Sequence, residues 1–343
     1  MVLPAPGSTT ARWKWSQVTP ARFRKVCLFA VWALVFIIVS GAAVRLTGSG
    51  LGCKDWPSCR VHPNVKPWRY HEFVEFGNRL VTLALTVAII AAVLFSVFRA
   101  PRRRDLVWLS SGLMAGLVGE IVLGGIVVLY KLAPQLVMAH FMYSFILLLD
   151  GLVLYHRAGF ADGPADERGW ARPAAAAQPV VSSELRAIGG LLLASVSVVI
   201  FLGTIVTSTG PHGGDPTARR FDLSLHDVAK LHSSAVILFL GLTVVTLWRM
   251  LQSGAPRDVI RRGEVLLVVL VIQGAVGYIQ YLSGVPAWLV QVHVTLAAAL
   301  WVVALQFFLA LTRRPGLAAS PVPAGDAEFS SSRAASGSAL APA

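Results

Sequence analysis

The sequence predicts an all-α polytopic membrane protein with eight transmembrane helices, arranged as two tandem, parallel four-helix-bundle repeats. Three observations lead to this expectation. The 343 residues are 55% hydrophobic and only 14% charged, which gives more apolar surface than one water-soluble core can bury. The apolar residues fall into eight stretches long enough to cross a bilayer. The two halves of the chain also share short motifs in the same order.

Each of the eight stretches holds the roughly 20 mostly apolar residues that a spanning helix needs. In order they are 26–46, 74–98, 106–130, 134–155, 187–209, 227–248, 264–283 and 287–312. They divide the chain into a basic N-terminal segment (1–25), a first repeat (26–156), a linker (157–186), a second repeat (187–312) and a tail (313–343). The linker and the tail are rich in small residues and proline, so we expect both to lack regular structure.

The formal net charge of +13 does not indicate a nucleic-acid partner, because the basic residues interrupt alternate connections instead of lining one face. They cluster before the first helix and after the second, sixth and eighth. By the positive-inside rule these connections, and with them both termini, are expected to be cytoplasmic. The basic N-terminal segment also has the composition of a transit peptide, so a cleaved targeting segment stays an alternative.

Three pairs of motifs relate the halves. GAAVRLTGSG (41–50) matches GTIVTSTGPH (203–212), and VEFGNRLVTL (74–83) matches VAKLHSSAVI (228–237). A third match, between 120–141 and 273–294, aligns His140 with His293. Each repeat has four helices, an even number, so both copies enter the membrane in the same direction. Parallel repeats also occur in transporters, and a transporter therefore remains an alternative.

The second half carries two histidines, His232 and His293, on alternate helices of one predicted bundle. A lone histidine near a helix end is usually an interfacial hydrogen-bonding residue, but two at this spacing suit an iron porphyrin held edge-on in the bundle. Each imidazole would supply one axial nitrogen. Zinc would require further ligands that the sequence does not place nearby. We therefore predict that His232 and His293 bind a haem iron.

The first half keeps His140 but has Asn78 at the position of His232, and an amide is a poor iron ligand. Glu75 precedes Asn78 by three residues and projects from nearly the same helix face. Its counterpart in the second half is Ala229. A buried carboxylate is costly unless it is paired or takes part in chemistry.

Two interpretations of Glu75 stay open. It forms an ion pair with Arg79 or Arg45, or it accepts a proton beside a substrate. Because alanine stands at the position of Glu75 in the other repeat, the proton-accepting role is favoured. The second half would then hold a cofactor, and the first half would carry out the reaction.

Cys53 and Cys59, in GLGCKDWPSCR, lie in the first connection expected outside the membrane, where oxidation is permitted. We predict a disulfide, with free thiols or a metal pair as alternatives. His71 lies one turn before Glu75, where interfacial packing is the default and contact with a substrate is the alternative. Glu120 aligns with Gln273, which favours an inward hydrogen-bonding role over catalysis.

Taken together, these motifs resemble the haem A synthase family. They are VRLTGSGLGCKDWPSC, EFGNR, LGGIVVL and VTSTGPHGGD, with His140, His232 and His293. The EFGNR form is similar to that of the actinobacterial branch, whereas better-known members carry a histidine at the position of Asn78. That departure argues against a substrate site with two histidine ligands.

The resemblance implies an oxidoreductase of the bacterial cell membrane that oxidises the C8 methyl of haem O to a formyl group by successive hydroxylations, with water as the oxygen source. It implies a haem b on His232 and His293, and a substrate haem near His140 and Asn78 with Arg79 and His71 beside it. Glu75 would be the catalytic base or would stabilise a cationic intermediate.

The implied partners are haem O, haem O synthase, terminal oxidase assembly factors and membrane lipid, and a homo-oligomer stays open. A dihaem electron carrier and a haem transfer protein remain as alternative functions.

Overall fold

The computed structural model describes residues 18–53, 56–57, 59 and 70–313. Within them lie eight long helices: α1 (Pro20–Leu46), α2 (Tyr70–Phe98), α3 (Arg104–Leu129), α4 (Pro134–Ala158), α5 (Ser183–Thr209), α6 (Leu225–Gln252), α7 (Arg257–Leu282) and α8 (Ala287–Ala310). All eight are long and apolar enough to cross a membrane. The expectation of an all-α polytopic membrane protein is confirmed.

Several helices begin earlier than the apolar stretches predicted, because helices continue through polar turns to their caps. Helix α1 starts at Pro20, where the Thr19 hydroxyl accepts from the backbone N–H of Arg22 at 3.3 Å and proline suits the first turn. Helix α6 starts at Leu225, behind a Ser224 cap on the N–H of Asp227. Hydropathy locates the membrane-crossing part of a helix and misses these ends.

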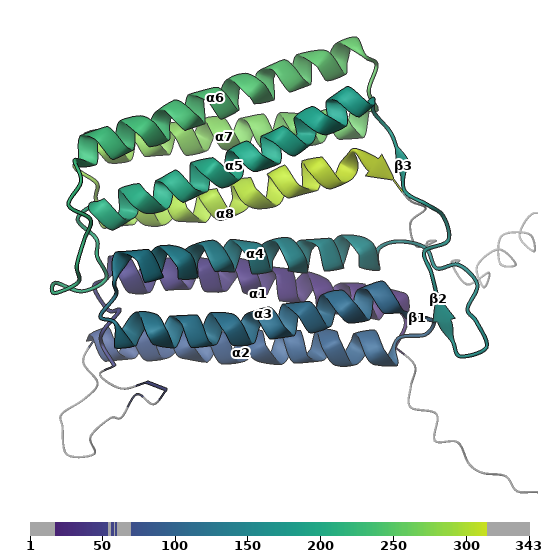
Figure 1. Cartoon of the computed structure of the whole chain (residues 1–343), viewed down its shortest axis with the longest axis horizontal. Coiled ribbons are helices and arrows are strands. Elements are labelled where there is room, and N and C mark those ends of the chain that lie inside the picture. The colour runs from purple at the N-terminus through teal and green to yellow at the C-terminus, as the bar shows by residue number, and fades with distance from the viewer. Residues whose placement is uncertain (1–17, 54–55, 58, 60–69, 314–343) are drawn as a thin grey trace, which may run out of the picture.

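Each half closes its four helices into a ring, since consecutive helices touch and the fourth touches the first. The first ring is α1 to α4 and the second is α5 to α8, and Figure 1 shows the two lying side by side with their helices along a common axis. Helices α1 and α4 form most of the contact with α8 and α5. The two rings have the same order of neighbours, which fits the expected repeat; the symmetry axis between them stays a prediction.

The two ends of the bundle differ in their connections. We call the end with the α1–α2, α3–α4, α5–α6 and α7–α8 connections the outer end, since the charge pattern predicts that it faces outside, and the opposite end the inner end. The halves are joined at the core by Trp301 of α8, whose indole Nε1 donates to the carbonyl of Phe145 on α4 at 3.1 Å. The aromatic side chains of Trp301 and Phe145 also meet edge to face, with ring centroids 6.0 Å apart.

The linker between α4 and α5 has little regular secondary structure, only two strands of two residues each, but it makes specific contacts. Helix α4 runs to Ala158 and α5 starts at Ser183, and the segment between them folds against the inner end. The fully buried Arg99 side chain donates to both carboxylate oxygens of Asp162, at 3.0 and 2.9 Å. Composition could not reveal this, because the partner that orders the linker is far away in the sequence.

Four short strands complete the inner end. Strand β1 (Arg102–Arg103) pairs in parallel with β2 (Trp170–Ala171), and β3 (Gln178–Pro179) pairs antiparallel with β4 (Thr312–Arg313). The second pair ties the linker to the end of α8. The expectations for residues 1–17 and for the tail from 314 lie outside the described residues.

Candidate functional site

The four even-numbered helices start at the outer end and place their key polar residues at a common depth. Asn78, His140, His232 and His293 follow the starts of α2, α4, α6 and α8 by six to eight residues. At 1.5 Å per residue this is about 9–12 Å below the outer end. The two residues of each half stand on opposite helices of their ring, with the bundle interior between them.

In the second half, His232 and His293 come together as predicted. Their ring centroids are 6.5 Å apart and their planes are inclined by 70°. An imidazole nitrogen binds a transition metal at about 2.0 Å and lies about 1.1 Å from its ring centre, so two rings on opposite sides of one ion would have centres about 6 Å apart. The observed separation suits one ion between the rings.

Two glycines set the orientation of these rings. A Cβ at Gly277 of α7 would lie 3.1 Å from Cε1 and 3.5 Å from Nδ1 of His293, and one at Gly203 of α5 would lie 3.2 and 3.6 Å from the same atoms of His232. Only glycine allows so close an approach without displacing the ring. The Nδ1 edges, which are buried without hydrogen-bond partners, therefore face the neighbouring helices and leave Nε2 for a ligand.

The donor set fits a haem better than a bare metal ion. Among the residues that the structure describes, no group of three or more His, Cys, Asp or Glu side chains gathers at one point. Two imidazoles are too few for a structural zinc site, whereas a porphyrin brings its own four nitrogens and needs only axial ligands.

The first half repeats this arrangement on one side only. His140 packs against Gly124 of α3, where a Cβ would lie 3.1 Å from its Cε1, as His293 packs on Gly277. Across the bundle, the Oδ1 of Asn78 accepts a hydrogen bond from the Ser40 hydroxyl at 2.8 Å. A Cβ at Gly41 would meet nothing within 4 Å, so the space that His232 fills over Gly203 is free in this half.

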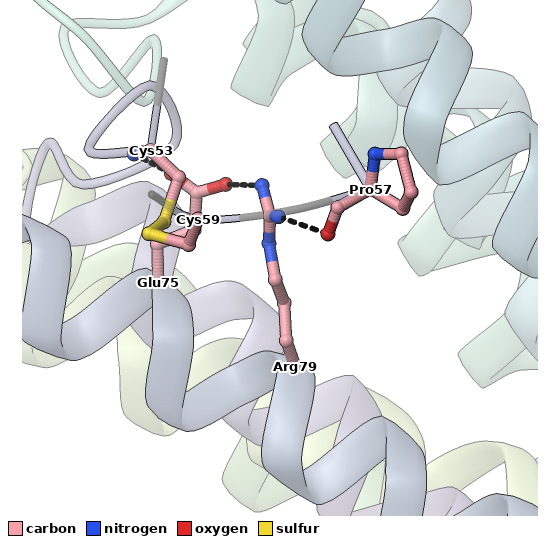
Figure 2. Close-up of a disulfide and its surroundings, with 5 residues drawn as sticks. All are labelled: Cys53, Pro57, Cys59, Glu75 and Arg79. Atoms are coloured by element: carbon pink, nitrogen blue, oxygen red, sulfur yellow. Dashed lines mark hydrogen bonds and ion pairs between the residues drawn. A yellow bond between two sulfur atoms is a disulfide. The ribbon is translucent and has the colours of Figure 1, made fainter. Parts of the chain in front are cut away.

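Glu75 is buried, with 6% of its surface exposed, and anchors the outer connection (Figure 2). Its Oε2 accepts from the backbone N–H of Cys53 at 2.7 Å, and its Oε1 pairs with Arg79 Nη2 at 2.6 Å. Arg79 also donates to the carbonyl of Pro57 at 2.9 Å. Cys53 and Cys59 form the predicted disulfide beside Glu75. Cys53 and Pro57, described residues of the connection between α1 and α2, are thus held against the first turns of α2.

Of the two ion pairs considered for Glu75, the structure forms the one with Arg79. Arg45 instead donates to the carbonyl oxygens of His212, at 2.8 Å, and Thr207, at 3.0 Å. Arg45 therefore joins the first half to the second at the outer end. The ion pair does not decide whether Glu75 also takes part in chemistry, and its catalytic role stays a prediction.

His71 also contacts the start of the connection between α1 and α2. Its Nδ1 lies 2.9 Å from the hydroxyl of Ser49, which is fully buried and lies 2.9 Å from the hydroxyl of Thr47. The predicted site residues thus form two groups at the outer end of the first half, one around Glu75 and one around Asn78. Sequence reasoning missed Ser40, although its alignment with Leu202 offered a signal: a polar residue replaces an apolar one where asparagine replaces histidine.

Comparison with known proteins now identifies the family. A family model described as COX15-CtaA, cytochrome oxidase assembly protein, matches residues 24–212, which is more than half of the chain. The chain belongs to the COX15-CtaA family. The match covers α1 from residue 24, α2, α3, α4, the linker and α5.

Individual relatives of the chain carry the name "Heme A synthase". The protein of Symbiobacterium thermophilum is 33% identical over 190 residues, which are 54% of this chain and 60% of the relative. Those of Bacillus licheniformis and Geobacillus kaustophilus are 33% and 31% identical over 122 residues, 35% of this chain and 39% and 37% of the relatives. The matched region of the chain thus spans between about a third and three fifths of these relatives. The resemblance to an actinobacterial branch stays a prediction.

Proposed function

We propose that this protein is a haem A synthase, an oxidoreductase that converts the C8 methyl of haem O to a formyl group by successive hydroxylations with water as the oxygen source. Membership of the COX15-CtaA family and the names of the relatives support this. Each hydroxylation adds an oxygen from water and removes two electrons and two protons. The protons must leave through protein groups, and an external redox partner must accept the electrons.

The observation that carries the proposal is the difference between the halves. The second half has two imidazoles at a separation that suits one iron ion. The first half has one imidazole, His140, and opposite it an amide already bonded to Ser40, with free space over Gly41. Two strong axial ligands favour retention of a haem, whereas a single one is compatible with release of a product. This favours a resident haem b on His232 and His293 and a substrate haem on His140.

Glu75 is proposed as the group that handles protons beside the substrate. Its carboxylate lies three residues, about one turn, above Asn78 and is shielded from water by the outer connection. The Arg79 guanidinium and the Cys53 N–H hold this carboxylate in one place, which an electrostatic stabiliser of developing positive charge requires. Proton acceptance would require Glu75 to exchange one of these contacts for the substrate side.

The bound ligand then has to come from the membrane or from a partner. We propose haem O synthase as the source of the substrate and terminal oxidase assembly factors as the destination of the product. We further propose that both termini are cytoplasmic, as the charge pattern predicts. Whether the protein forms a homo-oligomer has no bearing on the ligand sets, since each half supplies its own.

Pigment analysis of the purified protein, expressed with haem O synthase, tests the function. Acid–acetone extracts should contain haem b together with haem A or hydroxylated haem O. Haem b alone, in two equivalents per chain, would instead indicate a dihaem electron carrier. Unmodified haem O that exchanges with added acceptor protein, without any oxidised product, would indicate a haem transfer protein.

A further inference from the structure

In the first half, the carboxylate of Glu120 lies next to Nδ1 of His140. In the second half, a glutamine takes the place of this carboxylate beside His293. Glu120 of α3 places its Oε2 3.4 Å from Nδ1 of His140. Its other oxygen accepts a hydrogen bond from the hydroxyl of Ser144, one turn after His140 on α4. The Glu120 side chain is only 12% exposed, so this carboxylate lies within the helix pair and not in solvent.

The geometry selects which nitrogen of His140 is available to a ligand. Nδ1 faces Glu120, and Cε1 is the ring atom nearest to Gly124, so Nε2 is the ring nitrogen left for a ligand. The Nδ1–Oε2 contact is longer and less well aligned than an ordinary hydrogen bond, since neither atom has a partner by hydrogen-bond geometry. A small rotation of the imidazole brings the N–H onto the carboxylate, and ligation of a metal at Nε2 would fix the ring in such a position.

The second half shows that packing at this position does not require a charge. Gln273 stands where Glu120 does, and its Nε2 donates to the backbone carbonyl of His293 at 3.0 Å. Ala297 replaces Ser144, and Nδ1 of His293 has no hydrogen-bond partner. Since a neutral amide fits the same helix crossing, the charge of Glu120 and the hydroxyl that holds it serve something specific to the first half. A carboxylate within a spanning helix is otherwise costly.

We propose that Glu120 is a positioning residue for His140: it accepts the Nδ1–H, presents Nε2 to the iron of the substrate haem and increases the electron donation of the imidazole. This rests on the proposed function, in which His140 ligates the substrate. Carboxylates behind metal-bound histidines fix the tautomer and raise ligand basicity. A more strongly donating ligand stabilises the oxidised state of the iron and eases removal of electrons from the macrocycle whose methyl is oxidised.

The test exchanges the residues next to His140 and His293 in the full-length protein loaded with haem O. Glu120→Gln gives the first half the residue of the second without changing side-chain size. We expect the Fe(II)–His stretching band of the His140 site in resonance Raman spectra to move to lower frequency, and its reduction potential to rise. Turnover should fall about 10-fold or more, the usual effect of removing such a partner. Asp150→Asn is the matched control, because it removes a carboxylate that faces Gly112 in the same helix pair, about 15 Å along α4. It should leave the band unchanged.

The reciprocal variant, Gln273→Glu with Ala297→Ser, keeps the proposal testable if Glu120→Gln does not accumulate. It should lower the reduction potential of the haem b site. An unchanged Fe–His band in Glu120→Gln, or an unchanged haem b potential in the reciprocal variant, would overturn the inference. His140→Ala separates this from failure of the proposed function: if that variant still binds and oxidises haem O, His140 is not the ligand, whatever Glu120 does.

Discussion

Replacing Glu75 separates a catalytic carboxylate from a structural one, because the structure gives a different magnitude for each role. In the variant Glu75→Ala, the N–H of Cys53 loses its acceptor in a site where Cys53 is 2% exposed. A buried donor left unsatisfied costs about 1–3 kcal/mol. Arg79 loses its ion pair as well, but its side chain is 23% exposed and can be hydrated, so we assign it little of this cost.

The structural role alone thus predicts less folded protein and unchanged chemistry in each molecule that folds. The catalytic role predicts a loss of about 100-fold to 10,000-fold in turnover, the usual contribution of a general acid or base. A loss of this size exceeds what the stability change can produce once activity is counted per folded molecule. Glu75→Gln sharpens the comparison, because the amide oxygen can still accept from Cys53 while the charge is gone.

The assay measures haem A formed per haem b retained in purified protein, together with the amount of protein in the membrane. We expect both Glu75 variants to keep haem b and to lose conversion, with Glu75→Gln accumulating better than Glu75→Ala. Glu184→Gln, which breaks an exposed ion pair with Arg249 in the second half, serves as the control and should behave as wild type. A haem A to haem b ratio equal to wild type in Glu75→Gln would end the catalytic assignment and leave Glu75 as an anchor of the outer connection.

The other predictions address the remaining parts of the molecule. His293→Ala should abolish the low-spin haem b absorption bands, since it removes one of two axial nitrogens, and unchanged bands would refute the assignment. Thiol labelling of unreduced, denatured protein should reach only Cys27, the one cysteine outside the disulfide; labelling of three thiols would contradict it. Arg99→Ala should destabilise the protein by about 3–5 kcal/mol and expose the linker to protease, because it removes one partner of a buried ion pair. Arg249→Ala, at an exposed ion pair, should lower the stability measured by thermal denaturation by at most about 1 kcal/mol. Asn78→His should give the first half a second imidazole and slow release of the product, which is measured as haem A retained after purification; equal retention would show that the ligand count does not control release.

The membrane helices could be predicted from the sequence because a single physical term, the transfer of apolar side chains into lipid, determines where they lie. All eight were found, with errors only at the ends, where capping residues such as Thr19 decide the boundary. The linker could not be predicted, since its order depends on Arg99 meeting Asp162 across 63 positions of chain. Composition describes the average solubility of such a segment and carries no information on one specific buried pair.

The predicted internal repeat gave more information about the site than any single motif. Aligning the halves identified His232 and His293 as a pair, and the structure brings their rings within 6.5 Å. The same alignment could have revealed Ser40, which has Leu202 as its counterpart, and the link from Glu120 to Ser144, which has Gln273 and Ala297. Alignment could not predict where a side chain points. Only the fold shows that Glu75 turns toward the backbone of Cys53 and that Arg45 reaches the other half.

Three polar differences between the halves lie within a few turns of the outer end. The buried core of both halves is largely apolar and contains leucine, valine and phenylalanine from each. Near the outer end the first half replaces a histidine with Asn78, a glutamine with Glu120 and an alanine with Glu75. In the proposed function, the first exchange would weaken retention of a ligand, the second would change the electronic character of the remaining imidazole, and the third would supply a group for protons. An oxidation whose product must leave requires all three, whereas the alternative carrier function requires none of them.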